Sequence, residues 1–153
     1  MLKTPDQEIA QLLNSRAGRR ALAQHDFHWF LTIYFPHYLE YESPDFHQEI
    51  ISLITNPKPS FVAITAFRGS AKSTLCALAL PLWEVICTNR KHLVVIVCQN
   101  QSRASQSLSN IRLECETNEL LINDFGPFLT PQNLEWSTTS LVFAKQQARI
   151  TAA

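Results

Sequence analysis

Apolar residues recur at intervals of three and four along several stretches of the chain, and this spacing predicts amphipathic helices. Residues 5–23 and 73–87 fit the pattern, while residues 26–42 are so rich in aromatic side chains that core packing is the default interpretation. After a polar break at 99–102, a further helix presents one narrow apolar stripe. That stripe consists of Ala104, Leu108, Ile111 and Cys115.

A shorter helix is predicted to begin where the sequence reads Ser-Pro-Asp. Ser43 is expected to cap it, Pro44 suits its first position, and Asp45 would lie in the positive first turn. Two prolines within residues 56–59 end it. Its apolar side chains at helical spacing are Phe46, Ile50, Leu53 and Ile54.

Short apolar runs predict β-strands at residues 61–66, 93–98, 140–143 and 148–151. The first two flank a loop and the predicted helix 73–87, and a strand–loop–helix–strand unit of about forty residues has the size of a βαβ unit, whose strands are parallel. The sequence therefore predicts an α/β fold. We expect a parallel sheet in residues 43–153 and a helical N-terminal extension in residues 1–42.

The overall charge excludes one class of function. The 153 residues, enough for one domain with its own core, carry 13 basic and 13 acidic side chains, so the formal net charge is zero. Nucleic-acid binding by charge alone therefore does not fit this chain. We interpret a small basic cluster at Arg16, Arg19 and Arg20 as a solvated helix face, with a DNA or partner contact as the alternative.

Cysteine usage and hydropathy predict a cytoplasmic protein. No apolar run reaches the length of a membrane span, and the N-terminus has no hydrophobic signal core. The cysteines form no C-x-x-C pair and lie on predicted apolar faces, which indicates buried free thiols in a reducing compartment. They are Cys76, Cys87, Cys98 and Cys115. A zinc site that uses His25, His28 or His37 is an alternative without a second ligand cluster to support it.

One segment carries a chemical pattern, the run Ala-Phe-Arg-Gly-Ser-Ala-Lys-Ser-Thr at residues 66–74. A loop of small residues between a strand and a helix points backbone N–H groups at an anion, and a lysine followed by a hydroxyl residue completes a P-loop. Both glycines of the pattern G-x-x-x-x-G-K-[ST] are replaced, by Ala66 and Ala71. The strand and helix around the loop therefore carry this prediction. The plain alternative is a turn followed by a solvated Lys72.

A P-loop at this position implies a nucleoside triphosphate and Mg²⁺ as ligands. Lys72 would hold the β- and γ-phosphates, and Ser73 would place its hydroxyl on Mg²⁺. Arg68 would stabilise charge on the γ-phosphate in cis, with a structural salt bridge as the alternative. Backbone amides of six residues would cradle the phosphate oxygens. They are Gly69, Ser70, Ala71, Lys72, Ser73 and Thr74.

A second group of residues precedes the loop by one short helix. Phe46, His47 and Gln48 place an aromatic ring beside an amide, which suits stacking on adenine and paired hydrogen bonds along its edge. The alternative has Phe46 in the core and Gln48 in water.

A nucleotide-hydrolysing enzyme of this class also needs a carboxylate at the end of another strand to hold Mg²⁺. The nearest match downstream of the loop is residues 120–124, which continue the preceding helix and are interpreted as its end. The sequence therefore predicts nucleotide binding and leaves ATP hydrolysis by this chain open.

The loop 66–74 resembles the deviant Walker A loop of phage terminase large subunits, which often reads Arg-Gly-x-Ala/Gly-Lys-Ser. Residues 46–49 resemble the adenine-binding stretch of that family. Residues 94–104 are similar to its next strand and helix start, and residues 121–126 to the end of that helix. The resemblance covers about residues 43–153.

This resemblance implies an ATP-driven motor that packs viral double-stranded DNA into a procapsid in a bacterial host. The implied partners are a small terminase subunit and a portal ring, and the implied assembly is a ring. Lys72 and Ser73 carry over to phosphate and Mg²⁺, Arg68 to the loop arginine, and Gln48 to the adenine.

The Walker B carboxylates, coupling motif and nuclease domain of that family would follow residue 153. We therefore expect an N-terminal fragment or a truncated reading frame, marginally stable or aggregating because its sheet keeps an open edge. A helicase-like P-loop motor and a non-catalytic remnant are the main alternatives. A small-molecule phosphotransferase lacks any second substrate motif.

Overall fold

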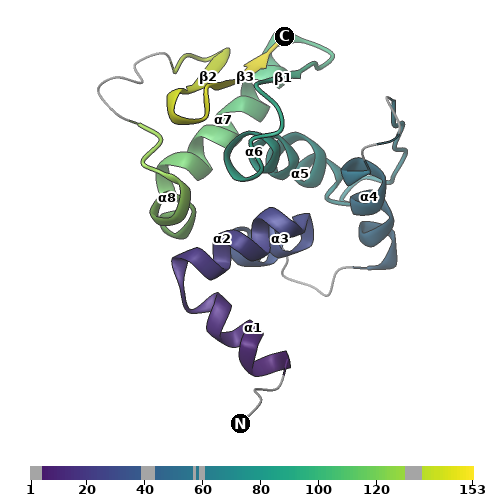
Figure 1. The fold of residues 1–153 in the computed structure, drawn as a ribbon. Coiled ribbons are helices and arrows are strands. Elements are labelled where there is room, and N and C mark those ends of the chain that lie inside the picture. The colour runs from purple at the N-terminus through teal and green to yellow at the C-terminus, as the bar shows by residue number, and fades with distance from the viewer. Residues whose placement is uncertain (1–4, 39–43, 57, 59–60, 130–135) are drawn as a thin grey trace.

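The computed structural model describes residues 5–38, 44–56, 58, 61–129 and 136–153. The chain is an α/β protein in which helices pack beneath a small sheet (Figure 1). The main helices before the loop are α1 (Pro5–Leu13), α2 (Arg16–His25), α3 (Phe27–Tyr34) and α4 (Asp45–Thr55). Later elements are β1 (Leu93–Ile96), α7 (Gln101–Thr117), α8 (Glu119–Phe125), β2 (Ser140–Phe143) and β3 (Ala148–Ala152). Short 3₁₀ turns occupy Pro36–Tyr38 and Ala144–Gln146.

One continuous helical run follows the loop 66–74, and we call it the loop helix, residues 72–87. It consists of α5 (Lys72–Thr74), a π turn (Leu75–Ala79), α6 (Leu80–Leu82) and a second π turn (Trp83–Cys87). The sequence predicts this helix one residue shorter at its start. Pro81 lies inside the run, where it cannot donate a backbone hydrogen bond, and it falls between the two π turns.

The sheet has the order β1-β3-β2, with β1 and β3 parallel and β2 and β3 antiparallel. Alternate residues of β3, Ala148, Ile150 and Ala152, are buried on the side that α7 contacts. On β1, Leu93 and Val95 face the other way and are 60% and 48% exposed. The predicted strands at 140–143 and 148–151 are confirmed, whereas the sheet is mixed and not wholly parallel.

The segment before the loop differs from the prediction. The exposure of residues 61–67 alternates along the chain, yet they form no strand. Among the described residues, the backbone of residues 61–66 makes no backbone hydrogen bond. A strand needs a partner, and β1 pairs with β3 instead. The predicted βαβ pairing of residues 61–66 with 93–98 is therefore absent from the described part of the chain.

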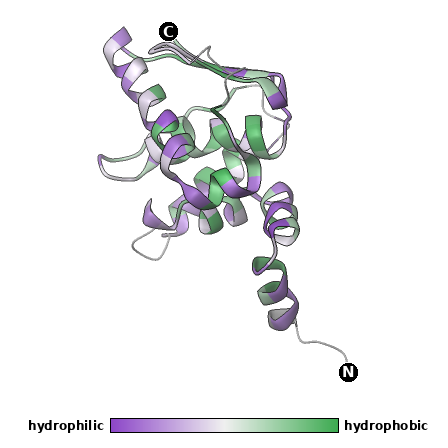
Figure 2. Ribbon diagram, turned by 90° about the vertical axis from the view of Figure 1, so that its left-hand side faces the viewer, coloured by the Kyte–Doolittle hydropathy of each residue, from purple (hydrophilic) through white to green (hydrophobic). Residues whose placement is uncertain are grey.

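The predicted helix at residues 5–23 is two helices. Ser15 ends α1 and caps α2, because its hydroxyl accepts a hydrogen bond from Gly18 N. The two helices approach so closely that a Cβ on Gly18 would lie 2.6 Å from Leu12 Cα. Figure 2 shows α1 projecting from the rest of the molecule toward the N-terminus.

The aromatic stretch packs in the core, as the sequence predicts. Phe27, Phe30 and Tyr34 are buried, and the Phe27 ring lies 5.2 Å from the Trp83 ring of the loop helix. Trp83 Nε1 also donates a hydrogen bond to Ala23 O at 2.8 Å. The N-terminal helices therefore share one hydrophobic core with the loop helix. Tyr38 is 40% exposed, and Tyr41 lies outside the described residues.

The interpretation of the basic cluster as a solvated face is wrong. Arg19 forms a bidentate pair with fully buried Asp124, at 2.7 Å to each carboxylate oxygen, and Tyr34 Oη donates to the same carboxylate at 2.9 Å. Arg16 donates twice to the backbone oxygen of Asp124, and the Arg20 guanidinium lies over the Phe125 ring. The three arginines therefore hold α2 against α8. We call Asp124 with Arg19 and Tyr34 the Asp124 cluster.

The electrostatics of the Asp124 cluster follow from these contacts. Burial by itself raises the pKa of Asp124, but hydrogen bonds from Arg19 and Tyr34 outweigh it and hold the pKa below its usual value. Burial raises the pKa of Tyr34, and the hydrogen bond to Asp124 raises it further. The carboxylate is therefore ionised and the phenol neutral at neutral pH.

The remaining helices agree with the sequence except at their ends. The N-cap of α4 is Pro44, without a side-chain hydrogen bond, and the predicted cap Ser43 lies outside the described residues. Ile50 is buried as predicted, whereas Leu53 is 40% exposed. The stripe on α7 is confirmed, since all four of its residues are buried.

The cysteines are free, which agrees with the prediction. Cys87 and Cys115 are buried, and burial raises the pKa of the Cys87 thiol to about 12. Cys76 and Cys98 are only partly buried. Among the described residues, no three His, Cys, Asp or Glu side chains gather as a metal site, and no helix is long and apolar enough to cross a membrane.

Candidate phosphate-binding loop

The backbone of the loop 66–74 curls through two left-handed residues. Gly69 has φ +86° and Ala71 has φ +55°, directly before the loop helix begins at Lys72. Glycine adopts this region without penalty, whereas an L-alanine there costs roughly 1–2 kcal/mol. Ala71 thus takes the conformation for which the usual motif provides a glycine, and the strain is stored in the loop.

The Lys72 side chain folds back across the loop. Its Nζ donates to Ala66 O at 3.1 Å and to Phe67 O at 3.2 Å. The ammonium is thereby held beside the curled backbone, close to the first turn of the loop helix. An anion approaching this turn meets a positive charge together with the amides at the start of a helix.

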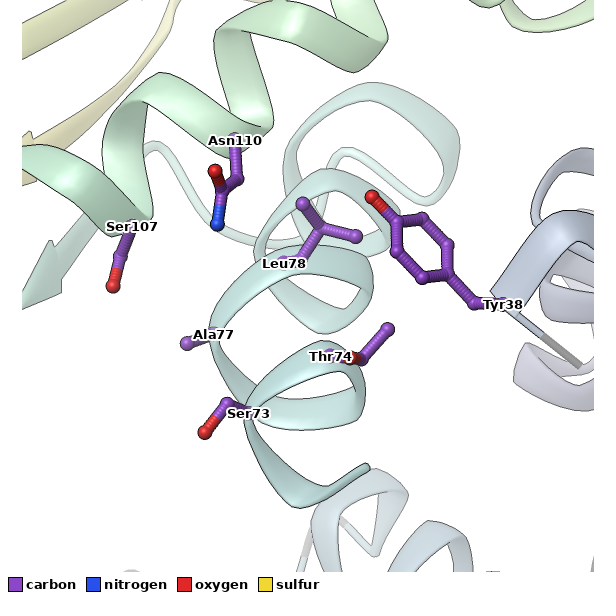
Figure 3. Close-up of a pocket in the computed structure, with 7 residues that line it drawn as sticks. All are labelled: Tyr38, Ser73, Thr74, Ala77, Leu78, Ser107 and Asn110. Carbon is purple, nitrogen blue, oxygen red and sulfur yellow. The ribbon is translucent and has the colours of Figure 1, made fainter. Parts of the chain in front are cut away.

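Ser73 and Thr74 line a small pocket between the loop helix and α7 (Figure 3). Ser73 is exposed, and its hydroxyl has no hydrogen-bond partner among the described residues. The pocket lining also includes Tyr38, Ala77, Leu78, Ser107 and Asn110. Hydroxyl and amide groups therefore line the pocket beside Ser73, and Mg²⁺ is a hard cation that takes oxygen ligands.

The other side of the loop rests on α4. His47 Nε2 lies 3.0 Å from Ser70 O, and the Phe46 ring meets the Phe67 ring edge-on at 5.4 Å. Phe46 and Glu49 line an apolar groove together with residues 63–67. Two side chains of α4 therefore hold the loop, one by a hydrogen bond and one by ring packing.

Gln48, the residue predicted to read adenine, is exposed and is not part of this groove. Phe46 is partly buried and does line it. The structure thus brings one member of the predicted pair beside the loop and leaves the other in solvent. The groove offers an aromatic face for a base, with Glu49 as its charged side chain.

Arg68 is exposed and forms no ion pair within the described part of the chain. The salt-bridge alternative for this residue is therefore not realised there. The guanidinium projects from the loop four residues before Lys72, as a second positive charge on the same loop.

The nearest match to a metal-holding carboxylate lies in a helix, as interpreted, but this helix is separate from α7, because Asn118 ends α7 and caps α8. Asp124 belongs to α8, and its carboxylate is paired with Arg19. It is therefore unavailable to a metal ion at the loop.

His47 is the site residue whose role sequence reasoning missed. The triplet at residues 46–48 singled out its neighbours for a base, and nothing in the local pattern pairs residue 47 with residue 70. The one signal was its position on a helix that directly precedes the loop. Ser107 and Asn110 were also missed, because they reach the pocket from a helix more than thirty residues further along the chain.

Comparison with known proteins adds no relative. No family model matches the chain, and neither a curated protein nor a solved structure is significantly similar to it.

Proposed function

We propose that the loop 66–74 binds the phosphates of ATP together with Mg²⁺. The observation that carries this proposal is the position of the Lys72 ammonium, held against the carbonyls of a loop that curls through Gly69 and Ala71 into a helix. Left-handed backbone at non-glycine residues is enriched at ligand-binding loops, which supports the proposal.

The residues of the loop divide the work on a triphosphate. Lys72 exchanges its two carbonyl partners for phosphate oxygens, and a bond between the ammonium and an anionic oxygen is stronger than its bonds to neutral carbonyls. The exposed Ser73 hydroxyl fits a magnesium ligand, because Mg²⁺ in nucleotide sites takes few protein oxygens beside water and phosphate. When bound, Mg²⁺ would neutralise phosphate charge. Arg68 adds a second cation on the γ-phosphate side.

Adenine binding in the apolar groove at Phe46 accompanies this proposal. The ring supplies a stacking face, while exposed Gln48 reaches the base only if its side chain turns toward the groove. The base contact is therefore the smaller part of the affinity, and the phosphate contacts the larger part.

By its resemblance to phage terminase large subunits, we propose that the chain is the N-terminal ATP-binding part of a viral DNA-packaging motor. Double-stranded DNA, a small terminase subunit and a portal ring are its proposed partners. Nucleotide binding without hydrolysis is the second candidate, favoured because Asp124 of α8, the nearest match to a metal-holding carboxylate, is paired with Arg19.

Calorimetric titration with ATP, with and without Mg²⁺, tests the nucleotide site. Lys72→Ala is expected to weaken binding at least tenfold, since it removes the charge nearest the phosphates. Lys145→Ala is the matched control, because Lys145 is exposed on a different turn of the chain. Equal affinity of wild type and Lys72→Ala, or no ATP binding by folded wild-type protein, contradicts the proposal.

A further inference from the structure

We propose that His47 is the positioning residue of the phosphate loop, presetting its backbone through the hydrogen bond to Ser70. This inference rests on the proposed nucleotide function, which it deepens by naming the side chain that holds the loop in its binding shape. His47 itself touches no phosphate in this account; it acts through the backbone of Ser70.

The hydrogen bond defines which nitrogen carries the proton. Ser70 O can only accept, so His47 Nε2 at 3.0 Å must donate. In the neutral ring, Nδ1 is then a bare acceptor, and it is buried without a partner among the described residues. Burying Nδ1 without a hydrogen-bond partner costs free energy, so the His47 ring is held in this place at a cost.

Ser70 is an unusual point to anchor. The residue is 2% exposed, and its hydroxyl has no hydrogen-bond partner within the described residues. Its own amide bonds weakly to Phe67 O at 3.4 Å. The loop therefore has little internal support between left-handed Gly69 and left-handed Ala71, and among the described residues the bond from α4 is the shorter of the two that the Ser70 backbone makes.

Lys72 and His47 therefore have different roles: Lys72 contacts the phosphates, and His47 positions the loop. Removing the His47 donor leaves the Ser70 carbonyl without its partner, so the amides at residues 70–72 sample other directions. A preorganised loop avoids the ordering cost at the moment a ligand binds. Affinity for phosphate should therefore depend on His47, and the base contact should not.

The test compares two substitutions of equal polarity and different reach. The amide nitrogen of glutamine occupies nearly the position of histidine Nε2, whereas that of asparagine lies near Nδ1. His47→Gln should restore the bond to Ser70 O, and His47→Asn should not. His47→Phe removes the donor and keeps a flat ring, and His25→Gln, at an exposed position of α2, is the control.

Two readouts are measured on the whole chain. The first is hydrogen exchange of the amides at residues 70–72 without ligand. The second is calorimetric affinity for ATP and for inorganic tripolyphosphate, which has no base. We expect His47→Phe and His47→Asn to speed the exchange and to weaken both ligands by the same factor, about tenfold, which corresponds to ~1.4 kcal/mol. His47→Gln and His25→Gln should behave as wild type.

Three results separate this inference from the proposed function. If binding depends on Lys72 while His47→Phe matches wild type in affinity and exchange, the inference is overturned and the nucleotide site stands. If His47→Phe weakens ATP but not tripolyphosphate, the residue serves the base and the inference is overturned as well. If folded wild type binds neither ligand while His47→Phe speeds the exchange, the nucleotide function fails and the anchoring of the loop stands.

Discussion

Both carboxylate oxygens of Asp124 accept two hydrogen bonds each, whereas the buried hydroxyl of Ser70 makes none among the described residues. The Asp124 carboxylate joins α2, α3 and α8, whereas Ser70 lies in the loop that precedes the loop helix. The Asp124 cluster has a carboxylate matched to its donors, while the loop keeps unpaired polar atoms and a left-handed alanine. The Asp124 cluster therefore contributes to the stability of the fold, whereas the unpaired atoms of the loop have another explanation, such as strain or a bound water or ion.

The largest expected effect comes from breaking the completed group. Asp124→Asn leaves the Arg19 guanidinium, only 14% exposed, without its negative partner, so the free energy of unfolding should fall by about 3 kcal/mol or more. Urea denaturation measures it. Glu116→Gln, which breaks the exposed pair with Arg112, is the control and should cost less than about 1 kcal/mol. If both variants lost a similar amount of unfolding free energy, the buried Asp124 pair would contribute no more to stability than an exposed one.

A second substitution tests the close contact of α1 and α2. Gly18→Ala should destabilise the protein by about 2 kcal/mol, because its Cβ collides with the backbone of Leu12. In an unhindered helix the same change would stabilise by about 1 kcal/mol. Ala21→Gly, at an exposed position of the same helix, measures that ordinary helical preference. A stabilised Gly18→Ala protein would show that α1 moves away from the new Cβ at little cost in free energy.

Lowering the pH tests the contribution of the Asp124 carboxylate to stability. The folded pKa of Asp124 lies below its ordinary value near 3.9, so the stability it contributes is complete above that pH and is lost as pH falls through the folded pKa. Wild type should therefore lose stability below about pH 4 more steeply than Asp124→Asn does. Denaturant midpoints at pH 3 and pH 6 give the two slopes. Parallel slopes would contradict the pairing.

The smallest effect is expected in the loop and has the opposite sign. Ala71→Gly should raise the free energy of unfolding by about 1 kcal/mol at most, because glycine accepts φ +55° but loses more entropy on folding. Urea denaturation beside Ala21→Gly, which should destabilise, separates strain relief from glycine entropy. A destabilised Ala71→Gly protein would show that the alanine is unstrained.

Local patterns predicted most of the elements because their causes are local. The stripe on α7 and the strands β2 and β3 follow from the spacing of apolar residues. The break at Ser15 was missed, although a serine capping a new helix is also a local signal. The segment 61–66 was predicted as a strand from composition, but a strand exists only with a neighbour, which composition does not supply.

The sequence predicts the position of the candidate loop, but it does not predict the distant contacts that hold the surrounding structure in place. Lys72 and Ser73 follow from a short motif read in context, and the structure places both at the start of the loop helix. The contact between His47 and Ser70 spans 23 residues, and that between Arg19 and Asp124 spans 105. No periodicity links positions so far apart. Marginal stability and aggregation of the chain stay predictions, and they agree with the exposure of Leu93 and Val95 on β1.

The loop helix has a mechanical consequence. Its sixteen residues span roughly 24 Å from the loop at one end to α2 at the other. The far end is clamped, since Trp83 donates to Ala23 O and Gln24 donates to Cys87 O. A displacement of Lys72 therefore cannot slide the helix lengthwise without breaking these bonds. We therefore expect a movement of the loop to be passed along the loop helix to the N-terminal helices. The surroundings of the Trp83 indole, which contacts both Ala23 and Phe27, should change with it.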